Sequence, residues 1–260
     1  FDYRNDNLFK ESLENIQRYL DGLGYPKEVI ENICFQKFIQ NNPDYYLYYP
    51  YLFDSAFDFS DKKVLEMLSI AGFLYYRSII LMDDIFDNKE ETSNFNDFLT
   101  INICQEETIK ILCTFFEKDS LFWHIWGKRK LEYLKAYRLD KQSHNIFSFG
   151  EYEVLCDYKS SFGKIAIDAL FVLTGKHYRN EYQSVLKSHK DFYVAFQILD
   201  DISDYEEDHI NGQFNISKNY LGKKVDNIES YSLGDQKKLL YLEGVAGNLY
   251  SKAHEHILRA

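Results

Sequence analysis

The fold is decided by a stretch in the last third of the chain, Phe196-Gln197-Ile198-Leu199-Asp200-Asp201-Ile202-Ser203-Asp204-Tyr205-Glu206-Glu207-Asp208. An apolar run precedes it, and helical periodicity continues through it. Residues four apart share one face of a helix, so Asp200, Asp204 and Asp208 are expected to form a stripe of carboxylates. A single stripe is also what an exposed acidic helix end looks like, although acids at a helix C-terminus oppose the macrodipole.

A second group of aspartates ends another apolar run, more than a hundred residues upstream, and reads Ser78-Ile79-Ile80-Leu81-Met82-Asp83-Asp84-Ile85-Phe86-Asp87. On a helix Asp83, Asp84 and Asp87 fall within one sector, where like charges repel. No Lys or Arg occupies the neighbouring turn, so a bound cation is expected. Mg²⁺ takes one or two carboxylates and completes its shell with waters and phosphates. Two such clusters therefore predict binding of a magnesium-chelated diphosphate.

The rest of the sequence predicts an all-α protein. Its 260 residues contain proline only at Pro26, Pro43 and Pro50, which leaves the remainder free for long helices. No alternation typical of strands extends over a useful length. We expect one domain over residues 1–260, with helices at roughly 6–22, 27–40, 62–88, 95–117, 120–138, 149–175, 180–208 and 234–258.

Composition excludes some classes of function. A net charge of −11 argues against nucleic acid as a partner, because nucleic acid is bound by basic patches. The longest apolar run, residues 68–82, is interrupted by Arg77, so no transmembrane segment is expected. The four scattered cysteines form no CxxC pair and favour reduced thiols in a cytoplasmic protein. The chain begins with Phe1, which leaves a removed targeting segment open.

The two aspartate clusters resemble the first and second aspartate-rich motifs of class I isoprenoid synthases. This superfamily contains the trans-isoprenyl diphosphate synthases and the class I terpene synthases. The later stretch matches the prenyl-synthase form FQxxDDxxDxxxD from Phe196 to Asp208. Tyr158-Lys159-Ser160-Ser161-Phe162-Gly163 is similar to the family's lysine–threonine segment. The resemblance covers roughly residues 45–225.

The resemblance implies an antiparallel helix bundle around a central apolar cavity, with both motifs at its mouth. It implies three Mg²⁺ ions, two held by Asp83, Asp84 and Asp87 and the third by Asp200 with Asp204 and Asp208. Lys159 would contact the diphosphate of a prenyl substrate, and Lys218 or Lys223 would add a second contact. Metals and lysines would neutralise the leaving diphosphate, so that the substrate ionises to an allylic cation. Homodimers are usual for this fold.

The sequence departs from the chain-elongating members, which bind isopentenyl diphosphate as a second anion. Those members carry a Gly-Gly-Lys-x-x-Arg segment, a His or Gln before the first motif, and an Arg-Arg pair after it. Here the upstream stretch, residues 45–53, has no basic residue, Tyr76 takes the His/Gln position, and Glu90 and Glu91 follow Asp87. A second diphosphate would therefore meet tyrosines and glutamates. These features favour a terpene synthase that ionises one prenyl diphosphate and then cyclises or quenches the cation.

Aromatic and small residues near the motifs are candidates for the wall of the cavity, since aromatic faces stabilise cations. The candidates are Phe73, Tyr75, Tyr76, Ser78, Ile79, Phe196 and Gln197. The small Ser78, one turn before Asp83, favours a substrate of C15 or longer. The second motif is not the NSE form usual in terpene synthases, and their late Arg-Tyr pair is absent before Ala260. The alternatives are a chain-elongating prenyltransferase, a non-catalytic partner subunit of one, and a plain helical scaffold.

Overall fold

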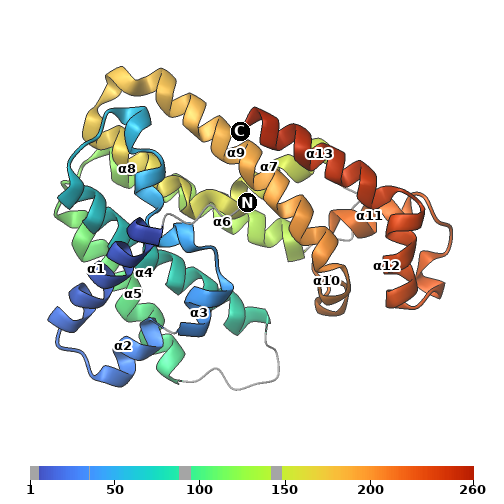
Figure 1. Ribbon diagram of the computed structural model, residues 1–260, viewed down its shortest axis with the longest axis horizontal. Helices are drawn as coiled ribbons and strands as arrows, with labels where there is room; N and C mark the ends of the chain where they lie inside the picture. Colours follow the sequence, from blue (N-terminus) through green and yellow to red (C-terminus); the bar gives the residue numbers. More distant parts are fainter. Residues whose placement is uncertain (1–5, 35, 88–94, 142–147) are drawn as a thin grey trace. The chain divides into compact units, whose positions relative to one another are not determined.

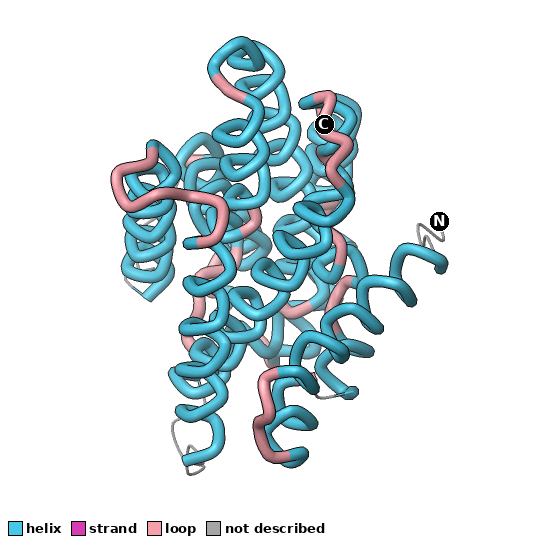
Figure 2. The backbone as a smooth tube through the Cα atoms, turned by 90° about the vertical axis from the view of Figure 1, so that its left-hand side faces the viewer, coloured by secondary structure: helices cyan, strands magenta, loops and turns pink. Residues whose placement is uncertain are grey.

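A computed structural model describes residues 6–34, 36–87, 95–141 and 148–260, and all of the regular structure in these ranges is helical (Figures 1 and 2). The prediction of an all-α protein is therefore confirmed. The α-helices are α1 (Asp6–Gly22), α2 (Lys27–Ile33), α3 (Gln36–Asn41), α4 (Lys62–Asp87), α5 (Phe95–Cys113), α6 (Leu121–Lys141), α7 (Phe149–Lys159), α8 (Lys164–Thr174), α9 (Arg179–Ser203), α10 (Tyr205–Asn211), α11 (Ile216–Gly222), α12 (Leu233–Leu242) and α13 (Val245–Arg259). Six short 3-10 helices accompany them in the described residues: η1 (Asp44–Leu47), η2 (Tyr49–Leu52), η3 (Asp54–Phe57), η4 (Ser160–Phe162), η5 (Lys176–Tyr178) and η6 (Ile228–Ser230).

The chain groups into two compact units, each assembled from two separate segments. Unit 1 comprises Phe1–Trp126 and Ile165–Tyr182, and unit 2 comprises Gly127–Lys164 and Gln183–Ala260. The first aspartate cluster (Asp83, Asp84 and Asp87) belongs to unit 1. The second aspartate cluster (Asp200, Asp201, Asp204 and Asp208) belongs to unit 2. That residues 1–260 make a single domain stays a prediction.

Helix α4 is the central element of unit 1. The carboxylate of Asp61 accepts hydrogen bonds from the backbone N–H groups of Lys63 and Val64 and so caps its first turn. The helix packs along its length against α5 and also contacts α1, η1 and η2. The segment Lys62–Ile85 of this helix is long and apolar enough to span a membrane, with a mean hydropathy of 1.5. However, 67% of its apolar window of 18 residues is buried within the protein. Such burial is typical of the core helix of a globular protein.

Unit 2 has a core built on the inner face of α9. Val194, Ala195, Ile198 and Ile202 are almost completely buried there. Aliphatic residues of α11, α12 and α13 pack in the same cluster: Ile216, Leu221, Leu240, Val245, Ala246, Leu249 and Ala253. The aspartates of α9 directly follow this buried stretch. The packing of α9 therefore fixes the position of the helix end that carries them.

Four of the predicted helices are interrupted in the structure. Residues 27–40 form α2 and α3, 149–175 form α7, η4 and α8, 180–208 form α9 and α10, and 234–258 form α12 and α13. Local chemistry explains two of these breaks. Gly244 has a positive φ of 69° where α12 gives way to α13, and the hydroxyl of Ser160 donates to the carbonyl of Asp157 at the end of α7. The short helix α11 was not predicted at all.

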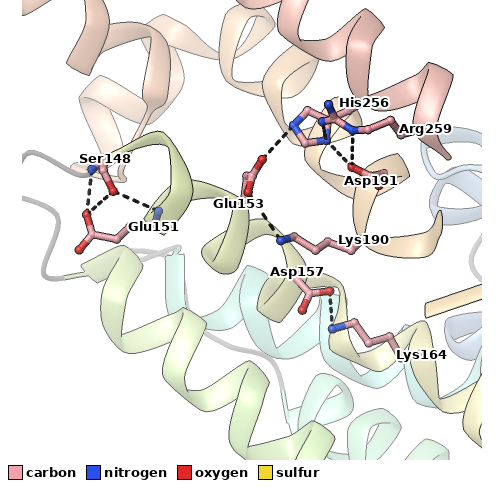
Figure 3. A network of polar contacts seen from close by, with 9 residues as sticks. All are labelled: Ser148, Glu151, Glu153, Asp157, Lys164, Lys190, Asp191, His256 and Arg259. Atoms are coloured by element: carbon pink, nitrogen blue, oxygen red, sulfur yellow. Dashed lines mark hydrogen bonds and ion pairs between the residues drawn. The ribbon is translucent and has the colours of Figure 1, made fainter. Parts of the chain in front are cut away.

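A buried network of charges attaches the last helix to the rest of unit 2 (Figure 3). The two ring nitrogens of His256 in α13 lie 2.6 Å from a carboxylate oxygen of Asp191 in α9 and 3.3 Å from one of Glu153 in α7. Arg259 and Lys190 lie beside the same two carboxylates, at 3.3 and 3.6 Å. A carboxylate thus lies at each ring nitrogen, and the guanidinium of Arg259 lies 2.8 Å from Nδ1 as well. Three helices therefore meet at one histidine.

Candidate functional site

Asp200 begins the second aspartate cluster, on the last turn of α9. The side-chain amide of Gln197 donates to Asp200 at 3.1 Å and to Asp201 at 2.8 Å, so that one residue orients both carboxylates. Burial and the neighbouring charge of Asp204 raise the pKa of Asp200 above its usual value. A carboxyl group in this position gains from a cation that offsets both effects.

Asp201 plays a different part, because its side chain points inward and is only 2% exposed. Its carboxylate accepts from the hydroxyl of Tyr152 at 3.2 Å and from the backbone N–H of Ile216 at 2.8 Å. Burial raises the pKa of Asp201 to about 7. These contacts join α7, α9 and the start of α11. That the metal ligands are the other aspartates of the cluster, without Asp201, stays a prediction.

The predicted carboxylate stripe is interrupted at Asp204. This residue lies between the last residue of α9 and the first residue of α10, with φ −95° and ψ 18°, although the backbone bonds from Asp204 to Asp200 and from Asp208 to Asp204 persist. Glu206, Glu207 and Asp208 consequently fall in the first turn of α10. The expectation that the acids oppose a helix C-terminus is wrong for these three, since negative charge at a helix N-terminus is favourable.

Asp208 is held by a residue that the sequence analysis missed. The side-chain amide of Asn215 donates to its carboxylate at 2.8 Å. Burial raises the pKa of Asp208 to about 6, even though this hydrogen bond acts in the opposite direction. The signal that could have revealed Asn215 is its place directly before Ile216, which with Tyr220 has the i,i+4 spacing of a helix face, since asparagine commonly begins a helix.

Lys159 lies close to the second aspartate cluster, as its predicted role requires. Its ammonium group is 3.1 Å from the carboxylate of Asp140 in α6. Burial alone would lower the pKa of Lys159, but Asp140 and Asp201 together raise it. The positive charge in turn lowers the pKa of Asp200, Asp201 and Asp208. The structure thus brings one fixed cation, with its own carboxylate partner, to the second aspartate cluster.

The other two predicted lysines lie near the surface of unit 2. Lys218 is in the first turn of α11 and its ammonium group is 3.5 Å from the carboxylate of Glu229. Lys223 follows the end of α11, with its ammonium group 5.5 Å from the centre of the Tyr220 ring. Neither the ion pair of Lys218 nor the ring contact of Lys223 involves an aspartate of the second cluster. The diphosphate-binding roles of both lysines stay predictions.

The first aspartate cluster occupies the end of α4 in unit 1. Asp83 is half-buried and Asp84 is exposed, while the side chain of Asp87 lies outside the described part of the structure. Sequence reasoning missed Arg77, which precedes Asp84 by seven residues and so lies on the same side of the helix. Arg77 is 4% exposed, donates to the carbonyl of Asn32 and stacks on the ring of Phe38. Burial lowers its pKa, while the charge of Asp84 acts to raise it.

The residue in the His/Gln position of the elongating enzymes, Tyr76, belongs to an aromatic cluster. Its ring is stacked on that of Tyr46 with 3.9 Å between the centroids, and its hydroxyl donates to the side chain of Asn42 at 2.6 Å. Tyr45 and Tyr49 in turn lie against Tyr46, at 4.7 and 5.6 Å. The upstream stretch that lacks basic residues is therefore folded over α4 as packed rings.

The remaining candidates for a cavity wall are mostly inside their units. Phe73 packs edge-on against Phe38, and Tyr75 lies 4.8 Å from the ring of Trp126. Ser78 and Ile79 are buried, and the hydroxyl of Ser78 donates to the carbonyl of Tyr75. In unit 2, Phe196 is 38% exposed and stands beside the rings of Phe192 and Tyr193. That these residues line a cavity stays a prediction.

The donor set fits a hard divalent cation. In the second cluster the side chains offer only carboxylate oxygens, and burial, followed by the charges of neighbouring aspartates, raises the pKa of Asp200 and Asp208. Within the described residues there is no group of three or more Asp, Glu, His or Cys side chains that could hold a metal ion. Mg²⁺ does not need one, since it is commonly held by one or two carboxylates together with substrate phosphates.

The fold itself is shared with a solved isoprenoid enzyme. The chain superposes on the geranylgeranyl pyrophosphate synthetase from the archaeon Geoglobus acetivorans with a TM-score of 0.74, covering 97% of this chain and 91% of that chain. The sequences are 14% identical, so the likeness defines the all-α fold of isoprenyl diphosphate synthases. No protein-family model and no curated protein sequence matches the chain.

Proposed function

We propose that the protein ionises a single prenyl diphosphate in a Mg²⁺-dependent reaction and then cyclises or quenches the resulting allylic cation, as a class I terpene synthase does. The observation that carries this proposal is the stack of Tyr46 on Tyr76. By the family resemblance, these neutral rings stand at positions that, in elongating enzymes, belong to the binding site of a second diphosphate. An anion is recognised by basic side chains, and these rings offer none.

The residues have distinct roles in this proposal. Asp83, Asp84 and Asp87 in one cluster, and Asp200, Asp204 and Asp208 in the other, hold Mg²⁺ bound to the diphosphate. The metal supplies positive charge that stabilises the departing diphosphate as its C–O bond breaks. Lys159 adds a fixed charge beside the second cluster, while Asp140 keeps its ammonium group oriented and protonated. The small side chain of Ser78 supports a substrate of C15 or longer.

The second candidate function is a chain-elongating prenyltransferase. It is favoured by the second aspartate cluster, which has the prenyl-synthase form, with Gln197 bonded to both Asp200 and Asp201. It is also favoured by the solved neighbour, which is a geranylgeranyl pyrophosphate synthetase. This reading requires isopentenyl diphosphate to bind without the usual basic residues.

Product analysis separates the two functions. The purified protein is incubated with Mg²⁺ and C10, C15 or C20 allylic diphosphate, each with and without isopentenyl diphosphate, and the organic products are identified by mass spectrometry. A hydrocarbon or alcohol formed from C15 or C20 diphosphate alone supports the proposal. Longer diphosphates that form only when isopentenyl diphosphate is present would establish the elongating function instead. Turnover of the C10 substrate alone would contradict the proposed chain length.

A further inference from the structure

Asn215 connects two aspartates of the second aspartate cluster with the start of α11 through one side chain. It is 3% exposed and lies between α10 and α11. Its amide nitrogen donates to the backbone carbonyl of Asp201 at 2.6 Å and to the carboxylate of Asp208 at 2.8 Å. Its amide oxygen accepts from the backbone N–H of Lys218 at 3.1 Å. Both donor hydrogens and the acceptor are therefore in use.

No other kind of side chain of this size has the same set of hydrogen-bonding groups. Aspartate would keep the acceptor that begins α11 but would lose both donors and add a negative charge beside Asp208. Serine would also cap the helix, but it is too short to span from the cap to Asp208. The choice of asparagine thus serves Asp208 as well as the helix.

We propose that Asn215 is a positioning residue for the metal–diphosphate site. Its side-chain amide orients the carboxylate of Asp208. The same amide caps the start of α11 and so fixes the position of Lys218. This inference rests on the proposed function, in which Asp208 is a metal ligand. Residues that orient a ligating carboxylate by hydrogen bonding commonly change metal affinity by roughly 10- to 100-fold when replaced. Asn215 is placed to act in this way.

The test measures binding of magnesium pyrophosphate, so that it does not depend on turnover. Affinity is determined by calorimetric titration of pyrophosphate into the protein in excess MgCl₂. For Asn215→Ser, which keeps a capping hydroxyl, we expect affinity to fall roughly tenfold. Ser232→Ala is the matched control, because Ser232 caps α12 through the N–H of Asp235 and touches no residue of the second cluster. It should bind like the wild type. Asn215→Asp serves as the second variant should Asn215→Ser not fold.

A double-mutant cycle with Asp208→Ala distinguishes positioning from general support of the fold. If Asn215 acts through Asp208, Asn215→Ser will cause no further loss of affinity in the Asp208→Ala background. An equal loss in both backgrounds, or no loss in either, would overturn the inference while leaving the proposed function intact. A wild-type protein that fails to bind magnesium pyrophosphate would remove the proposed function, and this inference with it.

Discussion

At the scale of single residues, neighbouring aspartates of one motif have opposite tasks. Asp200 is half-buried beside Asp204 and gains from a cation, whereas Asp201 is buried and already satisfied by Tyr152 and Ile216. Helical geometry separates the two, because consecutive residues point about 100° apart. The carboxylate of Asp200 is thus available to bind a cation, whereas that of Asp201 stabilises the backbone that carries Asp200.

The two aspartates should respond oppositely to truncation. We expect Asp200→Ala to lower Mg²⁺-dependent turnover roughly 100-fold or more, with the free energy of unfolding changed by only about 0.5 kcal/mol. Asp201→Ala should instead cost about 3 kcal/mol, because it leaves the Tyr152 hydroxyl and the Ile216 N–H buried without their acceptor. For both variants, urea unfolding measures stability and product formation measures turnover. Equal stability of the two variants would contradict the division of roles.

A buried histidine predicts a loss of stability in acid. Burial, followed by the charges of Lys164 and Arg129, lowers the pKa of His189 far below its usual value. Below about pH 6.5 the unfolded chain binds a proton at this residue that the folded chain does not, so stability decreases as the pH falls. The contribution approaches roughly 1.4 kcal/mol per pH unit.

The variant His189→Phe tests this contribution and keeps a ring beside Tyr193, whose centroid lies 4.6 Å from that of His189. Urea unfolding between pH 5 and 7.5 should show a shallower decline in acid for the variant than for the wild type. Identical slopes would mean that His189 takes up its proton equally in the folded and unfolded chain.

At the scale of elements, short breaks between helices decide where functional groups lie. The change from α9 to α10 at Asp204 moves Asp208 into the first turn of a new helix, and the following loop brings Asn215 back to it. In the same way, η1 and η2 fold the tyrosine-rich stretch onto α4. The long helices supply the frame, and the interruptions place the side chains.

The periodicity of apolar residues was sufficient to predict the long helices but not the breaks between them. The bounds of α1 and the course of α4 follow directly from apolar spacing, and the fold class with them. The break at Asp204 carries no proline or glycine, and its only local signal is the pairing of Asp204 with Glu207 three residues later, which is typical of a helix start. Asn215 and Arg77 were missed because their partners are set by tertiary packing. The grouping of Lys159 with the second cluster came from the family resemblance.

The last helix should depend on its histidine. Replacing His256 by alanine removes the group between the buried Asp191 and the partly exposed Glu153, which leaves both carboxylates with fewer partners. We expect the free energy of unfolding to fall by about 3 kcal/mol, and the amides of α13 to exchange faster with solvent. Ser251→Ala, on the same helix but exposed, is the control and should change stability by no more than about 0.5 kcal/mol. Unchanged exchange in α13 would show that the apolar contacts alone hold the helix.

At the scale of the whole molecule, the protein and its proposed substrate both carry negative charge. The chain carries a net charge of −11, and a free diphosphate is repelled by both aspartate clusters. Mg²⁺ reverses this repulsion by binding to carboxylates and phosphates together. Metal and diphosphate are therefore expected to bind cooperatively.

Thermal unfolding provides a direct measure of that cooperation. Mg²⁺ with pyrophosphate, at about 100 times the dissociation constant, should stabilise the protein by about 2.7 kcal/mol and raise Tm by about 5 °C or more. Mg²⁺ or pyrophosphate alone should have little effect, and a chelator should reverse the shift. A full shift with pyrophosphate in the presence of the chelator would contradict the metal assignment.

The packing of Tyr46 on Tyr76 also bears on how such a protein changes over evolutionary time. A histidine or glutamine restored at position 76 would lose the stacked ring and leave a void against Tyr46, at a cost of about 1 to 3 kcal/mol. A lysine or arginine introduced at position 46 alone would be buried among rings. Each of these single substitutions is harmful before a full set of basic residues is present. Under the proposed function, the aromatic stack therefore opposes the stepwise gain of a second diphosphate site in descendants of this chain.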